Sequence, residues 1–135
     1  MEKLIDMIEK LKSRCIKNEL LIMEEAKLSP AEYNGISALD PEERVCGNTL
    51  SLKMNLSPSR ASRVIDKLVR NGYLIREGDA SDRRRCTISL AEKGILVKKK
   101  IEEIREDCEK RVITNLTDRE MKYFTRSLKK INEVL

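Results

Sequence analysis

The side chains with the clearest chemical potential are the basic and hydroxyl groups that follow Pro58. A helix is expected to begin at Pro58, with Ser57 as its cap, and to bury a stripe that includes Ile65 and Leu68. Six polar residues flank this stripe: Ser57, Ser59, Arg60, Ser62, Arg63 and Lys67. Arginine can bind guanine through two hydrogen bonds, and serine can contact bases or phosphates. A basic helix face is more often a solvated surface, so both interpretations stay open for this helix alone.

A second basic group follows about fifteen residues later. Arg83, Arg84 and Arg85 are consecutive and come after two acids, Asp79 and Asp82, in a polar stretch between two expected strands. Arg76 belongs to the first of these strands. An arginine at a thin loop tip can enter a narrow minor groove, where negative potential is concentrated. An arginine triplet by itself usually only adds solubility, but here it lies at the end of an expected hairpin that directly follows an expected helix-turn-helix.

The positive charge of the chain is concentrated in this region. Residues 57–99 carry eleven basic and five acidic side chains, an excess of six positive charges, whereas the whole chain has a net charge of +5. A concentrated basic segment is typical of a surface that binds phosphates. Double-stranded DNA is therefore the expected partner.

The composition argues against an enzyme or a metalloprotein. The chain has no histidine, which removes the commonest general base and zinc ligand. Its four cysteines lie far apart, with no C-x-x-C pair: Cys15, Cys46, Cys86 and Cys108. We expect no catalytic residue, no metal site and no cofactor. No apolar run approaches a membrane span, so a soluble, cytoplasmic protein that does not contact a membrane is expected.

Apolar periodicity and start signals predict six helices that position these groups. The first spans about residues 2–26, and the second begins at a Ser29–Glu32 capping box and ends before Asp40. A short third helix carries Leu50 and Met54. The fourth runs from Pro58 to Asn71-Gly72, and the turn before it is so short that the third and fourth helices must cross steeply, as in a helix-turn-helix. Long helices follow over about residues 91–116 and from the Thr117–Glu120 capping box to the end.

Between the fourth and fifth helices the period changes to that of strands. Residues 73–76 are rich in strand formers, and residues 86–90 alternate apolar and polar side chains. The two strands predict a hairpin wing with a charged tip. The expected fold class is therefore mainly α with a small β-hairpin wing, a winged helix-turn-helix at residues 29–90.

The outer helices predict an interface between two copies of the chain. Apolar residues step along them by three or four positions: Leu4, Ile8 and Leu11 in the first helix, and Met121, Phe124, Leu128, Ile131 and Leu135 in the last. Three long helices cannot all bury such stripes against so small a wing domain. Residues 1–28 and 91–135 are thus expected to form a helical dimerisation module. The alternative is that these stripes form the core of a monomer.

The stretch from Leu50 to Gly94 resembles the core of MarR (multiple antibiotic resistance regulator) family repressors. The resemblance lies in Leu50–Ser57, in the helix around Ser59–Leu68, in Gly72–Arg76, in the Asp-x-Arg at Asp82 and Arg84, and in Leu90-x-x-x-Gly94. It implies a triangular homodimer, formed by the first, fifth and sixth helices, that represses transcription from a pseudo-palindromic operator. It also implies that Asp82 braces Arg84 in the minor groove.

The sequence departs from this family at the start of the fifth helix. The family usually has Leu-Thr there, with the threonine as cap, whereas this chain has Leu90-Ala91. A capping box from Ser89 to Glu92 could start the helix about two residues earlier.

The resemblance also raises the question of an effector. Some family members sense oxidants through a cysteine in the first helix, where this chain has Cys15. Cys15 lies on the apolar stripe and is either a small buried hydrophobe or a thiol activated by Arg14 and Lys17. Cys46, in an expected polar loop, is the other candidate, on grounds of exposure. A small phenolic ligand would have only three tyrosines and one phenylalanine to line its site.

One alternative function remains open beside DNA binding. A winged helix can be a protein-interaction module that does not touch DNA, in which case the basic residues 57–99 would be dispensable. The clustering of charge favours DNA.

Overall fold

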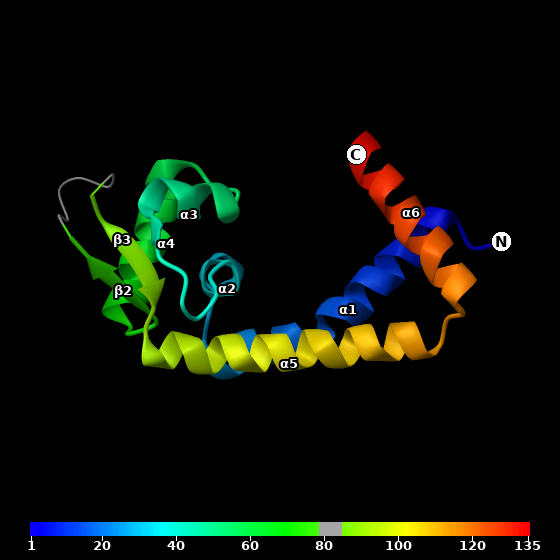
Figure 1. Ribbon diagram of the computed structural model, residues 1–135, viewed down its shortest axis with the longest axis horizontal. Helices are drawn as coiled ribbons and strands as arrows, with labels where there is room; N and C mark the ends of the chain where they lie inside the picture. Colours follow the sequence, from blue (N-terminus) through cyan, green and yellow to red (C-terminus); the bar gives the residue numbers. More distant parts are fainter. Residues whose placement is uncertain (79–84) are drawn as a thin grey trace. The chain divides into compact units, whose positions relative to one another are not determined.

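The computed structural model describes residues 1–78 and 85–135, and the chain divides into two compact units, Met1–Glu102 and Glu103–Leu135. The elements follow one another as α1 (Leu4–Ala26), α2 (Pro30–Ser37), β1 (Val45–Cys46), α3 (Gly47–Lys53), α4 (Pro58–Arg70), β2 (Leu74–Glu77), β3 (Thr87–Leu90), α5 (Glu92–Thr114) and α6 (Asp118–Val134) (Figure 1). None of the helices in the described residues is long and apolar enough to span a membrane.

Local capping signals start the helices where the sequence predicts. Ser29 Oγ accepts a hydrogen bond from Glu32 N at 3.2 Å, and Ser29 N donates to Glu32 Oε1, which completes the capping box of α2. Thr117 and Glu120 form the same box at α6. Ser57 caps α4 with Pro58 as its first residue. These motifs satisfy amide groups that a helix start leaves without partners.

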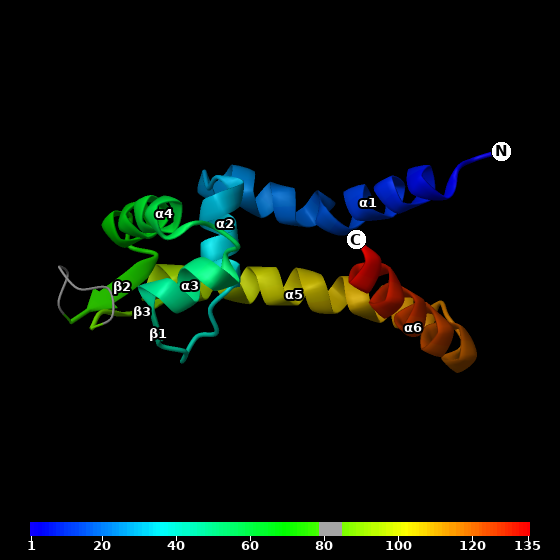
Figure 2. The same ribbon diagram turned by 90° about the horizontal axis from the view of Figure 1, so that it is seen from above.

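The two helices of the helix-turn-helix, α3 and α4, meet through a tight turn at residues 54–57. Asn55 takes the left-handed conformation there, with φ of 56°, a conformation that asparagine tolerates better than most residues. Figure 2 shows α2, α3 and α4 beside the sheet within the first unit. The largest fully buried side chains of this unit are Ile36, Leu39, Leu50, Leu68, Ile88 and Ile101.

The sheet has three strands in the order β1-β3-β2, all antiparallel, rather than the expected two. Leu74 is opposite Leu90 and Arg76 opposite Ile88 in the predicted hairpin. The additional strand β1 pairs Val45 with Ile88 on the other side of β3. Cys46 therefore ends a strand and caps α3, and the expected polar loop at this position was wrong.

The expected early start of α5 was also wrong. Ser89 lies in β3, paired with Ile75, so it cannot cap a helix. The helix begins at Glu92, and the carbonyl of Ala91 accepts the first helical hydrogen bond, from Ile95 N at 2.8 Å. The amide of Ala91 donates to the carbonyl of Tyr73, which ties the start of α5 to the end of the α4–β2 connection.

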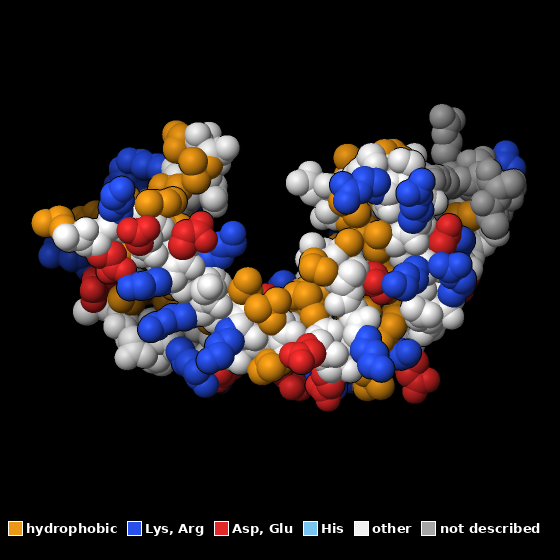
Figure 3. Space-filling model, turned by 180° about the vertical axis from the view of Figure 1, so that it is seen from behind, with side chains coloured by type: hydrophobic (Ala, Val, Ile, Leu, Met, Phe, Trp, Pro, Cys, Tyr) orange, Lys and Arg blue, Asp and Glu red, His pale blue; other side chains and the backbone are white. Residues whose placement is uncertain are grey.

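The long outer helices bury little within one chain. Ile22 is the one buried residue of α1, and α6 has none. Figure 3 shows orange apolar side chains exposed at the N-terminal end of α1 and along α6. The assignment of residues 1–28 and 91–135 to a single dimerisation module stays a prediction.

Candidate nucleic-acid interface

The recognition candidate α4 buries one face and exposes the other, as expected. Ala61, Ile65 and Leu68 are buried against the core. The polar residues predicted to contact DNA lie away from this face: Ser57, Ser59, Arg60, Arg63 and Lys67 are exposed, and Ser62 is half-buried. The helix therefore presents hydroxyl and guanidinium groups to solvent from its first two turns.

Arg60 and Arg63, like Arg70 at the other end of α4, are exposed basic residues. Neither guanidinium group forms an ion pair or hydrogen bond with another residue in the described part of the chain. Both belong to the N-terminal half of the helix, the part that contacts base edges in helix-turn-helix proteins. Two exposed guanidinium groups on such a helix are suited to bidentate contacts with guanine.

Lys67 and Arg76, by contrast, already have partners. Lys67 Nζ donates to Glu32 Oε1 of α2 at 3.2 Å, and Arg76 of β2 forms an ion pair with Asp66 of α4. The Lys67 side chain is still 55% exposed, whereas that of Arg76 is 27% exposed. These two residues therefore tie α4 to α2 and to the sheet, a role that the sequence analysis did not predict for either.

Glu32 contacts α4 as well as capping α2, although its sequence pattern indicates only a helix cap. Its side chain is 5% exposed and accepts hydrogen bonds from both Ser29 N and Lys67 Nζ. Burial by itself would raise the pKa of this carboxyl, but the hydrogen bonds from Ser29 and Lys67 outweigh burial, and the pKa is lowered from 4.5. The partner lies 35 positions away, so no local pattern could have identified it.

This lowered pKa predicts how the stability of the fold depends on pH. Because ionised Glu32 is favoured in the folded state, its contribution is present above the unfolded pKa and is lost as the pH falls through the folded one. Glu32→Gln keeps the capping box but removes the charge, so it is expected to destabilise the protein by about 1–2 kcal/mol at neutral pH. Urea unfolding should show this difference shrinking below about pH 4.

The control for the loss of one carboxylate is Glu25→Gln, on an exposed position of α1. A difference between wild type and Glu32→Gln that stayed constant from neutral to acidic pH would contradict the assigned role of the ionised carboxyl.

The wing arginines are only partly described. Arg85 is exposed, whereas Asp82, Arg83 and Arg84 lie outside the described residues. The bracing of Arg84 by Asp82 therefore stays a prediction. Figure 3 shows Lys and Arg side chains over the winged half of the chain, on the right of that view.

The two candidate redox cysteines differ in environment. Cys15 is exposed within one chain, so its expected burial is not achieved without a second molecule. Cys46 is half-buried, and its sulfur lies 3.1 Å from Thr49 Oγ1; hydrogen bonds from the hydroxyl and backbone of Thr49 lower the pKa of the thiol. Exposure thus favours Cys15 and acidity favours Cys46. In the described residues, no cluster of cysteine and carboxylate groups could hold a metal ion.

The residues predicted to contribute to a dimer lie on exposed apolar faces. Leu4, Ile8 and Leu11 of α1 are exposed, as are Phe124, Leu128, Ile131 and Leu135 of α6, and Met121 is half-buried. They are exposed within a single chain, as an interface with a second copy would require.

Comparisons with known proteins agree with this geometry. Residues 29–86 match the model of the MarR family, and no curated protein matches the chain. Among solved structures, the S. aureus MepR–DNA complex is 17% identical, with a TM-score of 0.74 and 100% of each chain covered. YusO from Bacillus subtilis is 18% identical, with a TM-score of 0.63 over 99% of this chain and 100% of that one.

A third solved structure is NadR in complex with 4-hydroxyphenylacetate, which is 13% identical, with a TM-score of 0.69 over 100% of this chain and 96% of NadR. At these identities the likeness shows a shared fold, and it extends over the helices outside the matched segment. Residues 29–86, which lie between α1 and α5, thus match the MarR family, and the chain has the fold of these winged helix-turn-helix proteins.

Proposed function

We propose that this protein is a sequence-specific transcription regulator that binds a pseudo-palindromic operator as a homodimer and acts as a repressor. The observation that carries the proposal is the exposed face of α4, where the Arg60 and Arg63 side chains have no ion pair within the described residues and lie in the first half of the helix. In this proposal α4 of each copy enters a major groove, and the wing reaches the adjacent minor groove. The DNA complex of MepR, which has the same fold, supports it.

The homodimer is proposed from the exposed apolar stripes of α1 and α6. A two-fold dimer would place two recognition helices about one helical turn, roughly 34–36 Å, apart on one side of the duplex. Release by a small ligand or an oxidant is a further part of the proposal. The complex of NadR with 4-hydroxyphenylacetate supports a phenolic effector, and the acidic thiol of Cys46 supports an oxidant.

The experiment is selection of duplexes from a randomised pool by the wild-type protein, followed by fluorescence anisotropy against the enriched operator. Arg60→Ala and Arg63→Ala are each expected to weaken operator binding by about 1–3 kcal/mol and to relax preference at one base pair. Single-base substitutions in the operator identify that position.

Arg70→Ala is the matched control, because it removes the same charge from the exposed last residue of α4. It should weaken binding to every duplex equally. Failure to enrich any duplex would contradict DNA recognition and leave the protein-interaction module as the better interpretation. Identical base profiles for all three variants would contradict base reading by Arg60 and Arg63.

A further inference from the structure

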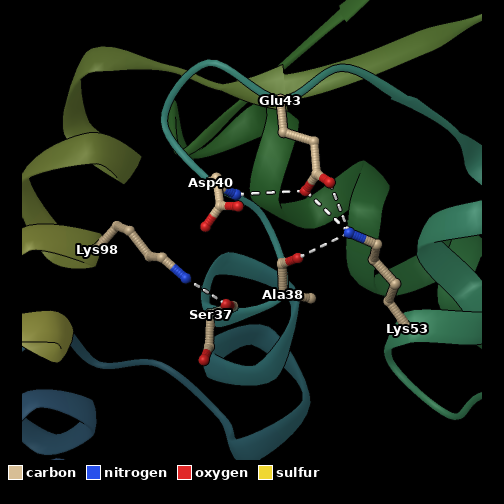
Figure 4. A network of polar contacts seen from close by, with 6 residues as sticks. All are labelled: Ser37, Ala38, Asp40, Glu43, Lys53 and Lys98. Carbon is tan, nitrogen blue, oxygen red and sulfur yellow. Dashed lines mark hydrogen bonds and ion pairs between the residues drawn. The ribbon is translucent and has the colours of Figure 1, made fainter. Parts of the chain in front are cut away.

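Two lysines from different helices hold the C-terminal end of α2. Lys98 of α5 donates from Nζ to the carbonyl of Ser37 at 2.5 Å, and Lys53 of α3 donates to the carbonyl of Ala38 at 3.5 Å (Figure 4). The last carbonyls of a helix lack partners within it and carry partial negative charge. Two ammonium groups there satisfy and stabilise the helix end.

Lys98 is the more constrained of the two lysines. Its side chain is 5% exposed, and its ammonium also pairs with Glu102 Oε1 at 3.1 Å, one turn further along α5. A buried ammonium must keep its partners, because burying an unpaired charge costs several kcal/mol. The Ser37 carbonyl is therefore held at a fixed place against α5.

Lys53 extends the same contact network to the loop after α2. Its ammonium forms an ion pair with Glu43 at 2.7 Å, and Glu43 Oε1 accepts a hydrogen bond from the amide of Asp40. Figure 4 shows both lysines pointing at the same helix end from opposite sides.

The other end of α2 holds the recognition helix. Glu32, in the first turn, accepts the hydrogen bond from Lys67 of α4. Close packing follows one turn later: a Cβ on Gly35 would lie 3.0 Å from Leu68 Cδ1, so the two helices approach as closely as a glycine permits. An eight-residue helix thus joins α5 at one end to α4 at the other.

We propose that Lys98 is a positioning residue for DNA recognition, which acts by fixing α2 and, through Glu32 and Lys67, the orientation of α4. The inference rests on the proposed function, since it concerns how accurately α4 meets the bases. Specific contacts require the reading side chains to be held within fractions of an ångström, whereas non-specific phosphate contacts tolerate displacement. Removing the Lys98 ammonium should therefore reduce specificity more than overall DNA affinity.

The test compares Lys98→Met with Lys99→Met, which removes the same charge from the exposed neighbouring position. Both are titrated against the selected operator and against a scrambled duplex of equal length, at a temperature where circular dichroism shows them folded. Lys98→Met is expected to weaken operator binding about tenfold and to leave scrambled binding unchanged. Lys99→Met should change both affinities by the same small factor. A merely structural role of Lys98 would not alter the operator-to-scrambled ratio of folded protein.

A double-mutant cycle tests the route through α2. The double variant of Glu32→Gln and Lys98→Met should lose less operator affinity than the product of the two separate losses, because each substitution loosens the attachment of α2. The double variant of Glu32→Gln and Lys99→Met should lose operator affinity by the full product of the two separate losses. Lys53→Met removes the second hydrogen bond to the end of α2 and should lower the ratio of operator affinity to scrambled-duplex affinity by a smaller factor. This variant provides the test if Lys98→Met does not fold.

The outcomes separate this inference from the proposed function. Wild-type protein that binds operator and scrambled duplexes equally would overturn both. Selective wild-type binding with an unchanged ratio in Lys98→Met, or in Lys53→Met where Lys98→Met is unfolded, would overturn the positioning role alone. A fully multiplicative cycle of Glu32 and Lys98 would overturn the route through α2.

Discussion

Leu128→Asp is expected to convert the proposed homodimer to a monomer and to abolish operator binding. The side chain of Leu128 lies between Phe124 and Ile131 on the apolar stripe of α6, a helix that buries no residue within its own chain. If a second copy covers this stripe, the new carboxylate is buried without a partner, at a cost of several kcal/mol. A monomer also presents a single recognition helix, so the contacts to two half-sites can no longer add. Light scattering and anisotropy measure the two losses.

The control is Arg126→Asp, which places the same carboxylate on the opposite face of the same helix, at an exposed position beside Lys122 and Lys129. This variant should remain a dimer and bind the operator, with only the small loss due to its added negative charge. A wild-type protein that scatters as a monomer, or a Leu128→Asp variant that stays dimeric, would contradict the interface on α6.

Gly94→Ala is expected to destabilise the winged domain by roughly 3 kcal/mol or more, the upper range for overpacking a tight site. A Cβ at this position would lie 2.2 Å from the carbonyl oxygen of Tyr73. That oxygen cannot easily move, because it accepts the hydrogen bond from the amide of Ala91 that ties the start of α5 to the sheet. The gain in helix propensity on replacing glycine by alanine, at most about 1 kcal/mol, is too small to compensate. Urea unfolding gives the difference.

Gly35→Ala provides the comparison, because its added Cβ would meet the ends of two side chains, Leu68 and Met54, rather than backbone. Those side chains can shift by a few tenths of an ångström, so the loss should be clearly smaller than for Gly94. Equal losses would indicate that the backbone contact at Tyr73 is not what requires glycine at position 94.

Sequence reasoning succeeded wherever the signal was local. The capping boxes at Ser29 and Thr117 and the Ser57-Pro58 start are complete within four residues, and the structure confirms each of them. The apolar stripe of α4 likewise follows from spacing alone. The winged helix-turn-helix could therefore be predicted before any tertiary contact was known.

The predictions from sequence were wrong where a residue far away in the chain determines the local structure. β1 is two residues long, too short for any alternation, and it exists because β3 pairs with it. Ser89 and Glu92 have the spacing of a capping box, but strand pairing with Ile75 is the stronger constraint on Ser89. A local sequence pattern cannot show whether such a serine caps a helix or pairs within a strand.

The candidate site shows the same limit. Lys67, Arg76 and Arg60 all appear as basic residues of one region, and nothing in their spacing distinguishes them. Glu32 and Asp66 supply the distinction, because they pair with Lys67 and Arg76 and leave Arg60 free of a carboxylate partner within the described chain. The sequence thus predicted which region carries the candidate site, whereas tertiary contacts distinguish the basic groups that brace α4 from those that have no carboxylate partner among the described residues.

The pairing of β1 with β3 has a consequence for how the protein is made. Val45 and Cys46 precede α3 and α4, but their partners Ile88 and Thr87 follow them by about forty residues. As synthesis proceeds from the N-terminus, α3 and α4 leave the ribosome while β1 still has no strand to pair with. The long loop must then close before these contacts can form, a step that slows folding relative to a purely local helix pair. The helix-turn-helix therefore acquires its full set of contacts only after the wing has been translated.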